Sequence, residues 1–201
     1  MSERDTTIEY YEEHAEKFVE LTLDADMSVI YARFEKWLNV GDSILDLGSG
    51  SGRDSRYFSE NGYEVTAVDP SPAMCRKTRE IANVPVYEFR AEEIPFVERF
   101  NGVWACASLL HVEENKMRLA IQKIANSLKL NGVAYMSWKY GSGERQDGMR
   151  HYTDYSEEGV KVLLREIESL ESVDLWTTVD SLPGRDDVSW TNVIVKKNVS
   201  N

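Results

Sequence analysis

Hydrophobic and polar residues follow two spacings that alternate along this chain. Apolar positions recur at helical intervals over about 6–21 and 29–38, and short apolar runs bounded by glycine, proline or asparagine mark strands. Strands that alternate with helices favour an α/β fold with a mainly parallel sheet and helices on both faces. The pattern predicts further helices at about 53–60, 70–82, 113–128 and 157–168, and strands at 44–47, 63–68, 84–89, 102–107, 133–138, 173–179 and 188–195.

Length, composition and charge narrow the class of protein. The chain has 201 residues, of which 42% are hydrophobic, and this predicts one globular domain over 1–201. The formal net charge of −12, with Lys196-Lys197 as the one basic run, disfavours a nucleic-acid partner. Cys75 and Cys106 lie in apolar runs and are expected to be buried free thiols rather than disulfide partners or metal ligands. With no leader-like or membrane-spanning run, we expect a cytoplasmic protein.

The run ILDLGSGSGRDS at 44–55 is the most informative segment. A buried strand is followed by Gly48, Gly50 and Gly52 and then by a helix, so a ligand can lie against bare main chain near unpaired N–H groups. Asp69, fourteen residues after Ser55, ends the next strand, in the position where a carboxylate usually holds a ribose hydroxyl pair. The segment therefore predicts a cofactor that contains a nucleoside.

The spacing also indicates which cofactor. A dinucleotide fingerprint reads G-x-G-x-x-G, whereas this loop reads G-x-G-x-G and follows Asp46, which suits an ammonium and a sulfonium better than a pyrophosphate. Asp46–Gly52 together with Asp69 resembles the first two motifs of the class I S-adenosylmethionine-dependent methyltransferases. The resemblance covers about 6–196. It implies a Rossmann-like seven-stranded sheet, mainly parallel with an antiparallel last strand, over 41–197, and a helical lid over S-adenosylmethionine at 1–40.

The resemblance assigns roles to residues on the cofactor side. Main chain at the glycine loop is expected to hold the methionine part, Asp46 to orient the loop and favour the ammonium, and Asp69 to bind the ribose. Pro70 and Met74 are plausible adenine walls, although a helix start and core filler explain them equally well. Arg90 stands where the family usually has an acid. The predicted cofactor contacts are Tyr11, Arg33, Asp46, Gly48, Ser49, Gly50, Gly52, Arg53, Asp69, Pro70, Met74, Ala91, Glu92 and Cys106.

The N-terminal segment carries a further resemblance. Residues 10–18 are similar to the Tyr-x-x-x-Ala-x-x-aromatic helix that closes over the cofactor in many small-molecule methyltransferases. Tyr10 or Tyr11 is then expected to touch the methionine carboxylate and Arg33 to pair with it. A simple amphipathic helix explains the same apolar spacing.

The acceptor side is expected in the crevice between the strands of Asp46 and Ala105. His111 lies just beyond the second strand and is either a general base or a residue that shapes the pocket. Four cations follow the later strands, and they either converge on an anionic substrate or remain solvated loop charges. These cations are Lys139, Arg145, Arg150 and Arg185. The predicted catalytic residues are His111, Lys139, Tyr140 and Arg150, and no metal site is predicted.

These features predict methyl transfer from S-adenosylmethionine to a small molecule by a monomer or homodimer. The later segments are similar to small-molecule enzymes grouped near the tellurite-resistance methyltransferases. Ala-Cys-Ala-Ser at 105–108 replaces the Asn/Asp-Pro-Pro-aromatic motif of enzymes that methylate base amines, so methylation of DNA bases is not expected. The alternatives are an RNA- or protein-modifying methyltransferase, a non-catalytic S-adenosylmethionine-binding protein and, more distantly, an NAD-dependent oxidoreductase.

Overall fold

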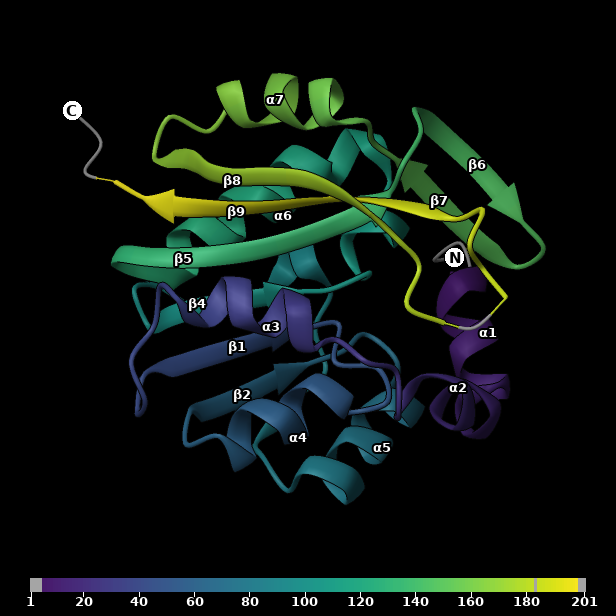
Figure 1. Ribbon diagram of the computed structural model, residues 1–201. Helices are drawn as coiled ribbons and strands as arrows, with labels where there is room; N and C mark the ends of the chain where they lie inside the picture. The colour runs from purple at the N-terminus through teal and green to yellow at the C-terminus, as the bar shows by residue number, and fades with distance from the viewer. Residues whose placement is uncertain (1–4, 183, 199–201) are drawn as a thin grey trace.

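The computed structural model describes residues 5–182 and 184–198 as an α/β fold around one large sheet (Figure 1). Seven strands run in the order β3-β2-β1-β4-β5-β9-β8, and β9 is antiparallel to both of its neighbours. The predicted fold class is confirmed. The strands are β1 Ser43–Leu47, β2 Glu64–Val68, β3 Val86–Tyr87, β4 Phe100–Ala105, β5 Leu128–Lys139, β6 Gly143–Asp147, β7 Arg150–Asp154, β8 Leu170–Val179 and β9 Ser189–Lys197.

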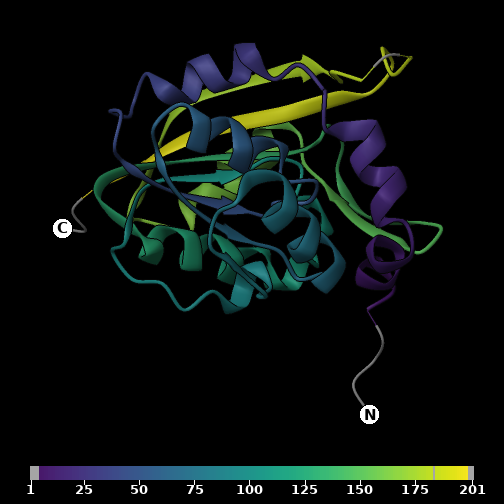
Figure 2. The same ribbon diagram turned by 90° about the horizontal axis from the view of Figure 1, so that it is seen from below.

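Helices cover both faces of the sheet (Figure 2). On one face Phe34 and Phe58, from two different helices, pack with Trp104 of β4. On the other face Ile121 and Leu163 belong to the largest buried cluster. The helices are α1 Thr6–Glu13, α2 Ala15–Thr22, α3 Ser28–Glu35, α4 Arg53–Glu60, α5 Pro72–Ala82, α6 Glu114–Ser127 and α7 Glu157–Arg165, with short 3-10 turns η1 Ala91–Glu93 and η2 Leu109–His111. None of the helices within the described ranges has the length and apolar character needed to cross a bilayer.

Local sequence explains where the helices next to the glycine loop begin and end. Gly52 takes a left-handed conformation at φ +79° and α4 starts at the next residue. Ser71 caps α5 by accepting the Met74 N–H at 3.2 Å, with Pro72 in the first turn. The left-handed Asn83 ends that helix at φ +52°. These signals bring the starts of α4 and α5 to the carboxyl ends of β1 and β2.

Two local predictions differ from the structure. The expected helix over 6–21 is divided at His14, whose backbone leaves helical geometry while its Nδ1 donates to the Tyr10 carbonyl at 2.9 Å. The segment after β5, where the sequence pattern predicts no strand, forms the antiparallel hairpin of β6 and β7. Its exposed first strand, GERQD, has no apolar alternation to reveal it. In Figure 1 this hairpin lies beside α1, beyond the carboxyl ends of the parallel strands.

Candidate active site

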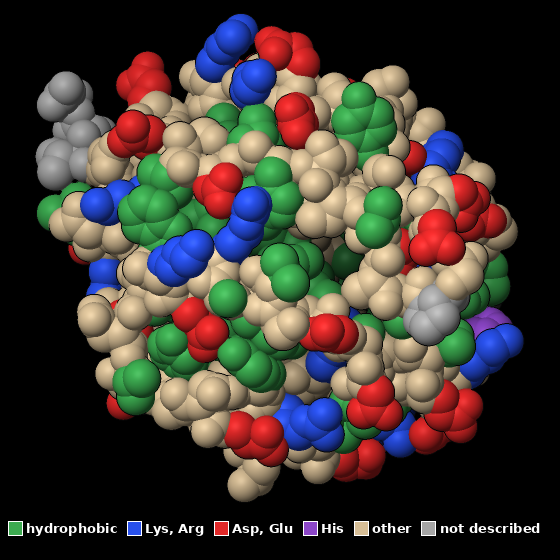
Figure 3. Space-filling view, in the orientation of Figure 1, with side chains coloured by type: hydrophobic (Ala, Val, Ile, Leu, Met, Phe, Trp, Pro, Cys, Tyr) green, Lys and Arg blue, Asp and Glu red, His purple; other side chains and the backbone are tan. Residues whose placement is uncertain are grey.

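A large cavity lies where the carboxyl ends of β1, β2 and β4 face the N-terminal helices. Its volume is about 1340 Å³, above the roughly 300–1,000 Å³ of ordinary small-ligand pockets, so it can hold two molecules side by side. The glycine loop and β2 contribute one end, and β5, β7 and the β8–β9 connection contribute the other. On the face seen in Figure 3, cationic and acidic side chains are interspersed around the molecule rather than gathered by sign.

The glycine loop is shaped by close approach of neighbouring elements. Gly48 has φ +81°, and a Cβ there would lie 2.2 Å from the Cβ of Ser108, whose Oγ donates to the Leu47 carbonyl at 2.6 Å. At Gly50, φ is +51° and a Cβ would lie 3.1 Å from the ring of Phe18. Gly48, Ser49 and Gly50 line the cavity.

Asp69 stands beside this loop at the end of β2. Its two carboxylate oxygens accept the N–H groups of Gly50 and Ser71, each at 2.9 Å. Burial raises the pKa of Asp69 to about 6. Each carboxylate oxygen has a second acceptor site, so the side chain can still bind a pair of hydroxyls presented from the cavity. The structure thus places Asp69 where the sequence predicts a ribose contact.

The expected adenine contacts also come together in the cavity lining. Pro70 and Met74, at the start of α5, line the cavity together with Ala91 and Glu92 of η1. Arg90, the departure from the family pattern, pairs through Nη1 with Asp5 at the N-terminus of α1, 2.5 Å away. Arg90 therefore ties the N-terminal helices to this wall.

Three of the predicted cofactor contacts lie elsewhere. Gly52 is absent from the cavity lining, and a Cβ there would approach the Thr78 Cα of α5 at 2.9 Å, so this glycine allows two helices to pack. Asp46 is buried beneath the loop, where its Oδ2 accepts the Ser55 hydroxyl at 2.6 Å. It supports α4 and does not line the cavity. Arg33 is also outside: it lies 4.3 Å from the ring of Trp176, drawn there by stacking and by an acid on β8.

A buried polar cluster centred on Asp54 lies next to the glycine loop. The sequence pattern did not indicate the role of Asp54. Asp54 accepts hydrogen bonds from the Tyr31 hydroxyl, from Trp104 Nε1 at 2.8 Å, and from Arg53 Nε and Nη2 at 2.7 and 2.9 Å. Burial alone would raise the pKa of Asp54, but the Arg53 charge and these bonds keep it below its ordinary value. Burial and the negative charge of Asp54 raise the pKa of Asp46. Arg53 lines the cavity next to Cys106, whose Sγ is 3.9 Å from Nη2. The one sequence feature that pointed to this cluster is the position of Asp54 in the first turn of α4.

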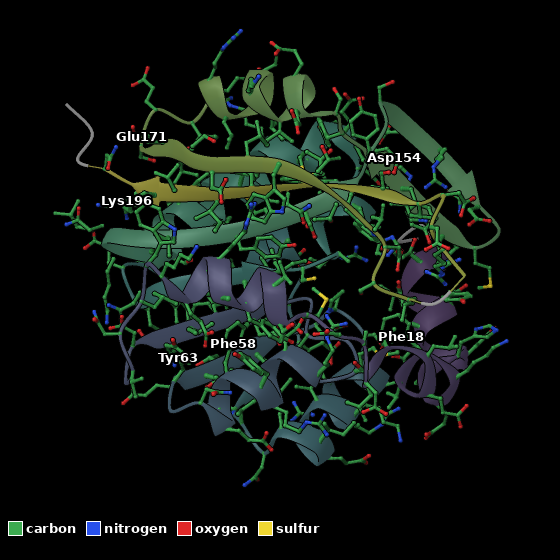
Figure 4. The ribbon with its side chains drawn as sticks, in the orientation of Figure 1. Phe18, Phe58, Tyr63, Asp154, Glu171 and Lys196 are labelled. Carbon is green, nitrogen blue, oxygen red and sulfur yellow. The ribbon has the colours of Figure 1, made fainter. Side chains whose placement is uncertain are left out.

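A row of rings connects the glycine loop with the far end of the cavity. Phe18, which faces the sheet from α2 (Figure 4), packs edge-on against Tyr11 with ring centroids 5.2 Å apart. The Tyr11 hydroxyl lies 2.9 Å from His111 Nε2, and His111 packs 5.0 Å from the Tyr152 ring. Burial and the charges of Arg150 and Lys139 lower the pKa of His111 to about 4. We refer to Phe18, Tyr11, His111 and Tyr152 as the aromatic row.

Three of the four predicted cations surround the last ring of this row. Lys139 Nζ lies 4.4 Å from the Tyr152 centroid, and the guanidinium carbons of Arg145 and Arg150 lie at 4.3 and 5.4 Å. Lys139 and Arg150 line the cavity, as does Arg185 on the β8–β9 connection. Burial and the charges of Arg145 and Arg150 lower the pKa of Lys139.

The three arginines lie in ion-pair range of acidic side chains, and in the described part of the chain the lysine does not. Arg145 pairs with Asp154 at 2.6 Å, and Arg150 and Arg185 have acids at 3.5 and 3.8 Å. Among the described residues, Lys139 forms no ion pair within 4 Å. Tyr140 was predicted as catalytic, but it is 55% exposed and lies outside the cavity, because the strand alternation turns it to the opposite face from Lys139.

Known methyltransferases are similar to this chain in sequence and in fold. Residues 44–132 match the family model described as a methyltransferase domain. The chain is 27% identical over 117 residues to an uncharacterized methyltransferase of Staphylococcus carnosus, covering 55% of each protein. It is 33% identical over 92 residues to a malonyl-[acyl-carrier protein] O-methyltransferase of Enterobacter lignolyticus, covering 45% of this chain and 36% of that protein. The chain thus spans about half or less of the length of these relatives.

Solved structures share the fold. One is a 1,6-didemethyltoxoflavin-N1-methyltransferase of Burkholderia thailandensis with bound 1,6-didemethyltoxoflavin and S-adenosylhomocysteine; it has a TM-score of 0.76 at 22% identity and covers 94% of this chain and 84% of that one. Another is the [4+2]-cyclase SpnF, with a TM-score of 0.73 at 15% identity, covering 95% of this chain and 94% of that one. At such identities the likeness establishes the fold.

Proposed function

We propose that this chain, which carries a class I S-adenosylmethionine-dependent methyltransferase domain, transfers the methyl group of S-adenosylmethionine to a small-molecule acceptor. One observation carries the proposal. A single cavity joins a glycine loop and a ribose-type carboxylate at one end to a cluster of cations at the other. Such a cavity can bring a nucleoside cofactor and a second molecule into contact.

The cofactor end fits S-adenosylmethionine. Gly48–Gly50 main chain would face its methionine part, Asp69 its ribose, and Pro70 and Met74 its adenine. When bound, this cofactor supplies a methyl group on a sulfonium, which is already an activated leaving group. The residues of the chain then have to align the acceptor with that methyl group and exclude water. Phe18 and Tyr11 close the cavity over the loop and serve the second task.

The acceptor end favours an anion. Lys139, Arg150 and Arg185 line it, and within the described residues Lys139 forms no ion pair, so its ammonium is available for a negative group. The similar proteins include one named as an O-methyltransferase of malonyl-[acyl-carrier protein] and one named as an N1-methyltransferase of 1,6-didemethyltoxoflavin, so the likeness does not select the acceptor atom. A net charge of −12 adds weight to a small molecule over RNA.

The test is methyl transfer from labelled S-adenosylmethionine into a host-cell extract that is then split into small-molecule and macromolecular fractions. We expect label in the small-molecule fraction, and less of it with the Asp69→Ala variant at the same S-adenosylmethionine concentration. Label in RNA or protein would contradict the acceptor class and leave the cofactor assignment intact.

Label in neither fraction would contradict methyl transfer to any acceptor in the extract. Calorimetry with S-adenosylmethionine would then show whether the protein is a non-catalytic binder. A rise in melting temperature with NAD in place of S-adenosylmethionine would instead favour an oxidoreductase.

A further inference from the structure

The centre of the aromatic row is a hydrogen-bond chain whose proton positions follow from its partners. His111 Nδ1 lies 2.7 Å from the His151 carbonyl oxygen, which can only accept, so Nδ1 carries the hydrogen. With the pKa of His111 near 4 the ring is neutral at pH 7, and Nε2 then has a free lone pair. The Tyr11 hydroxyl 2.9 Å away must therefore donate to Nε2.

Strand β7 holds both partners of this bond in place. The His151 N–H donates to Thr7 Oγ1 at 2.9 Å, while the His151 carbonyl accepts from His111. Thr7 and Tyr11 are one helical turn apart and thus on one side of α1. A single residue of β7 therefore orients the tyrosine through its helix and the imidazole through its ring. Within the described parts of the chain, no carboxylate hydrogen bonds to Tyr11 or His111.

The pair lies between the two ends of the cavity. Tyr11 packs against Phe18, which contacts the glycine loop, and His111 packs against Tyr152, around which the cations gather. Both Tyr11 and His111 line the cavity. An acceptor whose anionic group lies at Lys139 would therefore extend past this pair toward the cofactor.

We propose that Tyr11 and His111 form a proton relay for the acceptor, and that the acceptor is an anionic molecule whose nucleophile carries a dissociable proton. This inference rests on the proposed function. As the acceptor oxygen or nitrogen bonds to the methyl carbon, its proton passes to the Tyr11 oxygen and the tyrosine proton passes to His111 Nε2. The methyl–sulfur bond breaks and sulfur keeps the electron pair. One positive charge leaves sulfur and one appears on the imidazole.

The anionic group has a second role in this scheme. The charges of Arg150 and Lys139 help to keep His111 neutral. A negative group bound between them offsets those charges and raises the proton affinity of the imidazole. The base is therefore strengthened when the acceptor is in place, and weak when the cavity holds the cofactor alone.

The decisive variants separate the relay from packing. Tyr11→Phe keeps the ring against Phe18 and removes the hydroxyl. His111→Asn keeps an N–H that can reach the His151 carbonyl and removes the proton acceptor. Tyr87→Phe, at an exposed position of β3 outside the cavity, is the matched control. Each full-length protein is tested for S-adenosylmethionine binding by calorimetry and for label transfer into the small-molecule fraction of a cell extract.

The Tyr11 hydroxyl is bonded to His111 Nε2 instead of being left free for the methionine carboxylate. We therefore expect both relay variants to bind S-adenosylmethionine within about threefold of the wild-type affinity and to transfer label at least roughly 100-fold more slowly, the usual scale of a general base. The control should match the wild type. The labelled product should resist alkali, as ethers and amines do. The rate should rise with pH in the wild type and lose that dependence in His111→Asn.

Two results would overturn the relay and leave the proposed function standing. One is an alkali-labile methyl ester as the product, because a carboxylate nucleophile has no proton to give up. The other is transfer by Tyr11→Phe and His111→Asn at the wild-type rate. Failure of the wild type to bind S-adenosylmethionine would overturn the proposed function and the relay together.

Discussion

The two ends of the cavity are built in different ways. Most of the cofactor end comes from one continuous stretch, residues 44–93, and its main bonds are short in sequence, such as Gly50 to Asp69. The acceptor end and the Tyr11–His111 pair beside it are assembled across the chain: Tyr11 meets His111 at a separation of 100 residues, and Thr7 meets His151 at 144. A local motif can thus specify a cofactor site, whereas the acceptor site depends on the whole fold and can change without disturbing the motif.

The largest effect is expected from Gly48→Ala, which disturbs the glycine loop at the cofactor end. A Cβ would lie 2.2 Å from Ser108 Cβ in a backbone already at φ +81°. We expect the free energy of unfolding to fall by about 2–4 kcal/mol and S-adenosylmethionine binding to be lost, as measured by denaturant unfolding and calorimetry. Gly143→Ala has a similar φ of +78° with nothing within 4 Å, and should lose only about 1 kcal/mol. Equal losses would show that backbone strain, not contact with Ser108, matters at Gly48.

Asp69→Ala tests the cofactor end alone. It removes the predicted ribose contact, and we expect S-adenosylmethionine affinity to fall at least roughly tenfold, the equivalent of one charged hydrogen bond, in a calorimetric titration. Asp147→Asn, an acid of the β6–β7 hairpin at the other end, should leave that affinity unchanged. Unchanged affinity in Asp69→Ala would remove the ribose assignment.

Lys139→Gln tests the acceptor end alone. This change removes the ammonium that, within the described residues, forms no ion pair with an acid. We expect the KM for the small-molecule acceptor to rise roughly tenfold or more, with S-adenosylmethionine affinity unchanged. Lys161→Gln, on the exposed side of α7, is the matched control. A parallel loss of cofactor affinity in Lys139→Gln would show that the two ends are not separable.

The smallest effect concerns acid stability, where the two ends should act in opposite directions. Folded His111 binds its proton near pH 4 and the unfolded chain near 6.5, so this residue removes stability as pH falls through that interval. Folded Asp69 binds its proton near pH 6 and the unfolded chain near 3.8, so it restores stability as pH falls.

Denaturant unfolding at pH 6.5 and 4.5 separates the two contributions. His111→Asn should lose less stability on acidification than the wild type, and Asp69→Asn should lose more. Changes of the same sign in both variants would contradict the opposite assignments.

The sequence predicted the fold because its strands and helices carry clear periodicities and caps, and it predicted Asp69 and the loop because their spacing is fixed locally. It placed Arg33 wrongly because nothing in a helical pattern shows that Trp176, on a strand far along the chain, would attract the guanidinium. It missed Asp54 because an exposed helix start is the usual place for an acid. The first strand of the β6–β7 hairpin is polar along its whole length, so no hydrophobic alternation predicts it.

The N-terminal helices are attached to the two ends of the cavity by different kinds of bond. Toward α5 and η1 the attachment includes two partly exposed ion pairs, Asp5 with Arg90 and Glu16 with Lys77, beside the hydrogen bonds that Glu12 accepts from Ser71 Oγ and from the Ala73 N–H. Toward β7 and η2 it is made of the neutral bonds described above. Dissolved salt screens the exposed ion pairs and leaves the neutral bonds nearly untouched. Rising ionic strength should thus weaken the two ion pairs, while the Glu12 bonds and the bonds to β7 keep the N-terminal helices attached at both ends of the cavity.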